Sequence, residues 1–171
     1  MAVTITANGI NYGTAGPSTA GTITGFSGGV YYAVWNDYVD MVPVNEDAVI
    51  EPGYAYAFDG KKYIKTREYG DPQFFGLDSD TYGHGIGYRK DEKLLKVPVS
   101  GFALTYTDKE YEAGTPLTCT EGGLLTKASD ELLEKRPYMV IATYWKKEEK
   151  EEITDGTRTV KVNGRHWVRV R

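Results

Sequence analysis

Two carboxylates three residues apart, Asp37 and Asp40, are the pair in this sequence best suited to catalysis. If one carboxyl group were protonated and the other ionised, the pair could supply the acid and the base that cut a peptide bond. The Asn36–Asp37 bond before them would be the scissile bond, provided that it lies in a strained turn. On a strand, positions 37 and 40 face opposite sides, so a turn is needed to bring them together. The simpler hypothesis is that both aspartates hydrogen-bond the local backbone.

Other residues that could bind a ligand form incomplete sets. Asp78 and Asp80 could begin a calcium loop, because alternate carboxylates in a turn can face one cation, but no suitably spaced glutamate follows. We therefore expect a solvated turn there. Two histidines and one cysteine, Cys119, are too few for the usual structural zinc site. The glycine-rich residues 83–87 lack the strand and helix that flank a phosphate loop, and they predict a bend or bulge. We expect no metal and no cofactor.

A charge boundary divides the chain. Residues 1–36 contain no Lys, Arg, Asp, Glu or His, whereas mixed charges are dense from Asp37 onward. The first stretch alternates strand formers, as in residues 3–6 and 22–24, but has too few apolar side chains for a core. A segment without charges costs little to desolvate at a protein contact. We therefore expect residues 1–36 to be an arm for assembly or attachment, with a flexible leader as the alternative, and residues 37–171 to form a β-rich globular domain.

Turn signals separate short runs of strand formers in the second part. Residues 54–66 predict a hairpin around Asp59-Gly60, and residues 158–171 a second hairpin around Asn163-Gly164. Residues 94–106 alternate like a strand whose first part Pro98 restricts to a sheet edge or a strand start. The pattern predicts a mainly β fold, a small barrel or sandwich with an extended N-terminal arm.

One short helix is expected, over residues 130–135. Ser129 can cap its first turn, where Asp130 and Glu131 are favourable, and Pro137 ends it.

Composition excludes several classes of protein. The chain has 171 residues and a mass of 19.0 kDa, enough for one ordinary domain, or a small domain and an arm. A net charge of −4 argues against nucleic-acid binding. No apolar run approaches the roughly 20 residues that span a bilayer, and the first residues do not read as a signal peptide. Cys119 alone cannot form an internal disulfide, so we expect a protein made in a reducing cytoplasm.

Residues 33–40 (AVWNDYVD) resemble the AVWNDYAE signature of the phage peptidase G2 family. This family comprises the intramolecular chaperone, or autoproteolytic, domains at the C-termini of phage neck appendages and tail spikes. The similarity extends over about residues 30–171. It includes residues 51–53, 83–87, 97–101, 111–118, 123–128 and 162–168.

The resemblance implies a β-rich domain that trimerises on a phage fibre or spike. Active members cut their own chain before the Asp-Tyr-Ala-Glu element, which places the junction at Asn36–Asp37 and the family's glutamate at Asp40. The Asp40 side chain is one methylene shorter, and a misplacement near 1 Å can cost about a hundredfold in rate. The chain also has only 36 residues before that junction. We therefore expect no active catalytic residues.

We expect a phage virion structural protein: a minor capsid, head-decoration or fibre component made in the host bacterial cytoplasm. It would be a homotrimer attached to other virion proteins through residues 1–36, without nucleic-acid or membrane partners. The enzymatic alternative is a self-cleaving domain that uses Asn36, Asp37 and Asp40. A third hypothesis is a host-receptor or glycan-binding module whose tyrosines and tryptophans stack on sugar rings.

Overall fold

The computed structural model describes residues 3–6, 9–12, 37–154 and 158–170. The chain divides into two units, Met1–Ala33 and Val34–Arg171. In the first unit, β1 (Val3–Thr6) and β2 (Gly9–Tyr12) form an antiparallel pair. The strand formers of residues 30–35 and Asn36 lie outside the described residues.

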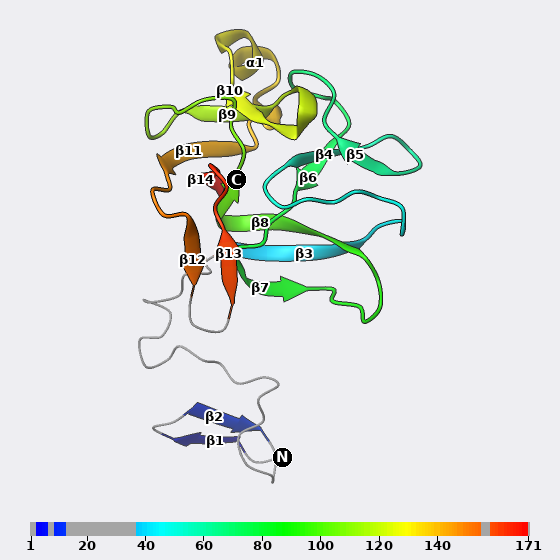
Figure 1. Cartoon of the computed structure of the whole chain (residues 1–171), viewed down its shortest axis with the longest axis vertical. Helices are drawn as coiled ribbons and strands as arrows, with labels where there is room; N and C mark the ends of the chain where they lie inside the picture. The colour runs from blue at the N-terminus through cyan, green and yellow to red at the C-terminus, as the bar shows by residue number, and fades with distance from the viewer. Residues whose placement is uncertain (1–2, 7–8, 13–36, 155–157, 171) are drawn as a thin grey trace. The chain divides into compact units, whose positions relative to one another are not determined.

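The second unit is built on a seven-stranded sheet (Figure 1). In spatial order its strands are β10 (Leu125–Lys127), β9 (Pro116–Cys119), β11 (Ala142–Lys147), β14 (His166–Val170), β8 (Leu94–Thr105), β3 (Asp37–Pro43) and β7 (Tyr82–Ile86). Neighbours run antiparallel except β3 and β7, which are parallel. The mainly β fold with one short helix is confirmed. The sheets are not closed into a barrel, so β7 and β10 remain as outer strands.

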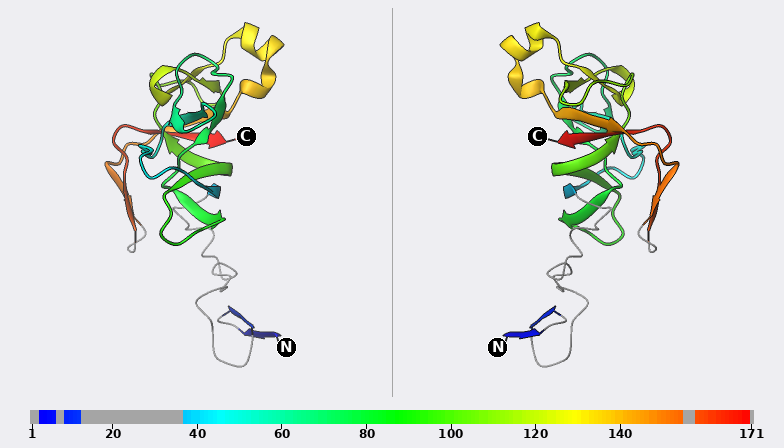
Figure 2. Two further views of the ribbon diagram at one scale, coloured as in Figure 1. Left: turned by 90° about the vertical axis from the view of Figure 1, so that its right-hand side faces the viewer. Right: turned by 90° about the vertical axis from the view of Figure 1, so that its left-hand side faces the viewer.

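Two smaller groups of strands complete this unit. A three-stranded sheet has the order β5 (Tyr63–Lys65), β4 (Ala55–Phe58), β6 (Phe74–Leu77), and a separate hairpin joins β12 (Glu152–Thr154) to β13 (Thr159–Lys161). The hairpin buries Ile153 and Val160 against Leu104 and Trp167 of the large sheet. Figure 2 shows the hairpin on one side of the sheet and α1 toward the other side.

A larger hydrophobic core is built around β9, β10, β11 and β14. It comprises Ala55, Leu77, Leu117, Cys119, Leu125, Ala128, Leu132, Met139, Ile141, Ala142, Tyr144 and Val168. The side chains of the two cores come from alternate positions of the same strand, as Trp167 and Val168 illustrate.

The short helix α1 (Asp130–Lys135) forms where the sequence predicts it. The Ser129 hydroxyl accepts a hydrogen bond from the backbone N–H of Leu132 at 3.1 Å, which satisfies one donor of the first turn. Leu132 is buried in the larger core. The 3₁₀ turn η3 (Pro137–Met139) follows at the proline that ends α1, and a second 3₁₀ turn, η2 (Glu121–Gly123), joins β9 to β10.

The predicted hairpin at residues 54–66 is confirmed as β4 and β5. The Asp59 carboxylate accepts the backbone N–H groups of Lys61 and Lys62, both at 2.9 Å, so the side chain itself stabilises the turn.

The predicted hairpin at residues 158–171 is wrong. A turn does form there, with Asn163 at φ 52° and Gly164 at φ 75°, and the Arg165 N–H donates to the Val162 carbonyl. The strands on its two sides then separate: β13 pairs with β12, and β14 lies between β11 and β8. Turn chemistry fixes the reversal of the chain, but long-range burial of the flanking strands selects their partners.

Two further expectations concern strand position. Pro98 lies inside β8 and not at its start, but β14 pairs only with residues 101–105 of β8, so among the described strands Pro98 pairs with β3 alone, as at a sheet edge. The β3–β8 register shifts between Tyr38 and Val39, at the residue paired with Pro98, and such an irregularity tolerates the missing N–H. Residues 82–86 form the strand β7, and its register against β3 shifts at Gly83, so the predicted bulge lies within a strand. A close approach does occur, because a Cβ at Gly85 would collide with Met41.

Candidate functional site

The two aspartates of the sequence-predicted pair lie on opposite faces of β3. Asp37 is 1% exposed and shares the inner face with Val39, whereas Asp40 is exposed with Tyr38 on the other face. Because the segment is a strand and not a turn, it does not bring the two carboxylates together. The arrangement leaves Asp37 without the second carboxylate that the acid–base hypothesis requires.

Asp37 instead belongs to a buried hydroxyl cluster. The Ser79 hydroxyl donates to Asp37 Oδ2 at 2.6 Å, and Ser79 Oγ lies 3.1 Å from the hydroxyl of Thr81. Ser79 and Thr81 are both completely buried. Burial raises the pKa of Asp37 to about 6, and the hydrogen bond from Ser79 opposes this rise. Oδ1 of Asp37 has no hydrogen-bond partner within the part of the chain that the structure describes.

Arg158 is the charged side chain that faces this cluster. Its charge lowers the pKa of Asp37, and its guanidinium donates to the Tyr82 carbonyl at 2.7 Å while lying over the Tyr82 ring. The cluster therefore joins the first residue of β3, the 79–81 segment and the start of β7. Sequence reasoning missed Ser79, Thr81 and Arg158, because they lie far from Asp37 along the chain and no motif links them to it.

The proposed calcium residues diverge and are held by cations. Asp78 is completely buried rather than in a solvated turn: it accepts the Lys96 N–H at 2.7 Å, and its second oxygen lies 3.4 Å from Lys96 Nζ. Burial raises the pKa of Asp78 to about 6 against the attraction of Lys96. Asp80 forms a two-point ion pair with the buried Arg165, at 2.7 and 3.0 Å. No group of three potential metal-ligating side chains occurs among the described residues.

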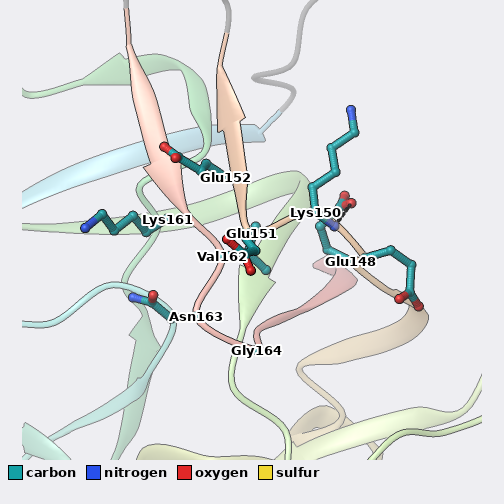
Figure 3. A pocket seen from close by; sticks show the side chains of 9 residues that line it. Glu148, Lys150, Glu151, Glu152, Lys161, Val162, Asn163 and Gly164 are labelled. Carbon is teal, nitrogen blue, oxygen red and sulfur yellow. Dashed lines mark hydrogen bonds between the residues drawn. The ribbon is translucent and has the colours of Figure 1, made fainter.

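A charged groove of about 470 Å³ lies beside the β12–β13 hairpin. Its lining comprises Glu148, Glu149, Lys150, Glu151, Glu152, Lys161, Val162, Asn163 and Gly164. Figure 3 shows Glu148, Lys150 and Lys161 pointing apart, not toward one point. Glu148 is also engaged, since it accepts the Trp167 indole N–H at 2.7 Å. These side chains do not converge as the groups of a catalytic site would.

A second, apolar groove of about 320 Å³ is lined largely by β6, the middle of β8 and the η3 region. Its side chains include Phe75, Val97, Val99, Tyr138 and Val170. Three of these are strongly exposed: Phe75 at 40%, Val99 at 50% and Tyr138 at 75%. Exposed aromatic and aliphatic side chains that gather in one hollow are typical of a protein contact.

The apolar groove continues across the outer strands. Val97 pairs with Asp40, and Asp40 pairs with Ile86, so these three side chains share one face of the sheet. Tyr38 lies two residues from Asp40 on the same face, is 56% exposed, and its ring lies 5.5 Å from that of His84. Ile86 is 63% exposed. We call this surface the apolar face; it comprises Tyr38, Phe75, Ile86, Val97, Val99 and Tyr138.

The remaining sequence candidates serve the core or the surface. Cys119 is buried in β9, where burial raises the pKa of its thiol. Trp167 is buried, whereas Trp145 is 43% exposed and packs on Phe102, and Trp35 lies outside the described residues. Neither of the two described tryptophans lines the apolar face.

One buried polar pair was not predicted at all. The Tyr144 hydroxyl lies 2.7 Å from His166 Nδ1, and burial lowers the pKa of His166. Burial of a neutral imidazole beside a phenol fits a structural hydrogen bond between β11 and β14.

Comparison with known proteins gives no match: no family model, no curated protein and no solved structure is similar to this chain. Within the described ranges, no helix has the length and apolar character that crossing a membrane would require.

Proposed function

We propose that this protein is a structural component of a bacteriophage particle, a minor capsid, head-decoration or fibre protein, that assembles as a homotrimer. The observation that carries the proposal is the apolar face, which exposes Tyr38, Ile86 and Tyr138. Tyr38 follows Asp37, the first charged residue after the charge-free residues 1–36. Large exposed apolar surfaces mark sites of assembly. The resemblance of residues 33–40 to phage peptidase G2 domains supports a phage particle as the setting.

The arrangement of charged groups also favours assembly over catalysis. Asp78 and Asp80 are engaged by Lys96 and Arg165, and Asp40 faces away from Asp37. The charged groove spreads its side chains apart. The ion pairs of Asp78 and Asp80 stabilise the domain, which explains why these charged groups are there. The exposure of the apolar face is not explained by any contact among the described residues of one chain.

Deletion of residues 1–30 tests the proposal. The truncated protein should keep the circular dichroism spectrum of the β-rich domain but should be lost from phage particles produced in its presence, as measured by mass spectrometry of purified particles. The control is full-length protein with Val49→Asp, a change at an exposed loop residue outside the apolar face. Normal incorporation of the truncated protein would show that the arm is not the attachment.

Self-cleavage at Asn36–Asp37 is the second candidate, because Asp37 has a raised pKa and lies 2.6 Å from the Ser79 hydroxyl. A carboxyl group that titrates near neutral pH can accept a proton from a reacting group. This candidate requires a mature N-terminus at Asp37 after expression. Asp40→Asn should stop the cleavage if both carboxylates act, and continued cleavage would remove Asp40 from the mechanism.

A further inference from the structure

We infer that residues 22–36 of a second copy of this chain pack in extended form on the apolar face, beside the outer edge of β7. The inference rests on the proposed assembly function, and it names the two surfaces that join the subunits. Four features support it: the exposure of the face, the open edge of β7, the composition of residues 22–36, and the lack of glycine and proline directly before β3.

The apolar face is uncovered in the described part of the chain. In the left panel of Figure 2 the β12–β13 hairpin stands on one side of β8, β3 and β7, and the opposite side of these strands carries no described element below α1. Ile86 is 63% exposed and Val99 is 50% exposed. Burying these two side chains at a contact would stabilise the complex. An extended segment laid across the strands would cover both side chains.

The β7 edge can also accept a strand. Among the described residues, β7 pairs only with β3, so its outer N–H and C=O groups have no strand partner. Its sequence, Tyr-Gly-His-Gly-Ile, has neither the lysine nor the proline that commonly protects a sheet edge. Gly83 and Gly85 present no side chain, which lets another backbone approach. Main-chain pairing at such an edge supplies affinity, and side-chain contacts supply specificity.

Residues 22–36 (TITGFSGGVYYAVWN) have the chemistry that this surface requires. They contain no charge, and the run from Val30 to Trp35 consists of apolar and aromatic residues, most of them strand formers. Among the residues of β3, β7 and β8 that share this face, Asp40 is the one carboxylate. Contact between an uncharged segment and a face with one charge therefore carries a small desolvation cost.

The residues directly before β3 favour a second copy over the same chain. β3 begins at Asp37 and runs across the face past Asp40, parallel to β7. Residues 30–36 contain neither glycine nor proline, the residues that most favour a reversal of the chain onto its own face. Residues 30–36 in extended form span about 23 Å, enough to reach a neighbouring subunit.

Cysteine crosslinking of the full-length protein tests this arrangement. The test variant carries Val34→Cys and Ile86→Cys, and the control carries Val34→Cys and Val49→Cys, since Val49 is 71% exposed but lies outside the face. The native Cys119 is buried and does not compete. After mild oxidation, the test variant should give bands at two and three times 19.0 kDa on a non-reducing gel, and the control should not. Crosslinks within single chains, an absence of crosslinks, or equal crosslinking in the control would overturn the inference.

A second measurement covers the case in which the cysteines alter folding. Ile86→Asp should raise the concentration for half-assembly at least tenfold, while Val49→Asp should leave it unchanged, as followed by native mass spectrometry with circular dichroism to confirm folding. The inference would be overturned if the Ile86→Asp variant assembled at the same concentration as the wild type. It would also be overturned if the wild-type chain stayed monomeric. Incorporation into particles is measured separately. Unchanged assembly of the Ile86→Asp variant would overturn the inference while the proposed function holds, whereas a monomeric wild-type chain would also contradict the proposed homotrimer.

Discussion

At the scale of single residues, Asp37 is the group whose environment departs most from what its sequence context suggests. The sequence suggests a pair with Asp40 or hydrogen bonds to the local backbone, yet the Asp37 carboxyl group is buried beside Ser79 and Thr81. Its pKa of about 6 in the folded protein exceeds the ordinary value of 3.8. The folded state therefore binds this proton more tightly than the unfolded state does.

The replacement Asp37→Asn should flatten the dependence of stability on pH. The contribution of the protonated Asp37 is fully present below about pH 4 and is lost as the pH rises through about 6, at a cost of up to about 3 kcal/mol. Urea unfolding between these pH values should show a smaller fall in the free energy of unfolding for Asp37→Asn than for wild type. Some fall should remain, because Asp78 also has a raised pKa near 6.

Asp40→Asn is the matched control for that experiment. Asp40 is on the same strand but exposed, so its replacement should leave the pH profile of the wild type unchanged. If Asp37→Asn keeps the full wild-type slope, the buried carboxyl group does not titrate in this range.

At the scale of elements, the turn at Gly53 forms backbone hydrogen bonds with two distant segments, at Asp78 and at Tyr106. Its N–H donates to the Asp78 carbonyl at 2.7 Å, and its carbonyl accepts from the Tyr106 N–H at 2.8 Å. A φ of +88° favours glycine, and a Cβ there would lie 2.5 Å from Arg165 Cδ. The turn therefore holds the buried Arg165 in place beside Asp80.

Gly53→Ala should destabilise the domain more than Gly60→Ala. Both glycines have a positive φ, which costs an alanine about 1 kcal/mol, but a Cβ at Gly60 meets nothing within 4 Å. The collision with Arg165 should add about 1–3 kcal/mol to the loss at Gly53. Chemical denaturation of the two variants measures the difference, and equal losses would mean that Arg165 moves aside without cost.

At the scale of the whole molecule, the prediction concerns assembly. A native mass spectrum of the purified full-length protein should show uncleaved chains in a complex of about 57 kDa, three times 19.0 kDa. Several large apolar side chains of the apolar face are exposed in a single chain. Assembly would bury them, and this burial favours the complex. Chains that begin at Asp37 would instead indicate self-cleavage, and an intact monomer would contradict the trimer.

Local chemistry in the sequence determined the mainly β character, the helix at Asp130–Lys135 and the hairpin at Asp59-Gly60. These depend on neighbours a few residues apart: a capping serine, a proline stop, and an aspartate that accepts N–H groups within its own turn. The absence of charge in residues 1–36 is likewise a property of the sequence alone. Such features can be read directly because they need no distant partner.

Only the tertiary structure decided which strands pair and which polar groups are buried. The turn at Asn163-Gly164 could be predicted, but the separation of β13 from β14 depends on which partners bury their side chains. Ser79 meets Asp37 across 42 residues, and Asp80 meets Arg165 across 85. The apolar face likewise exists because exposed side chains of β3, β7 and β8 meet those of β6 and η3. Contacts of this range arise from packing of the whole sheet, which spacing along the chain does not encode.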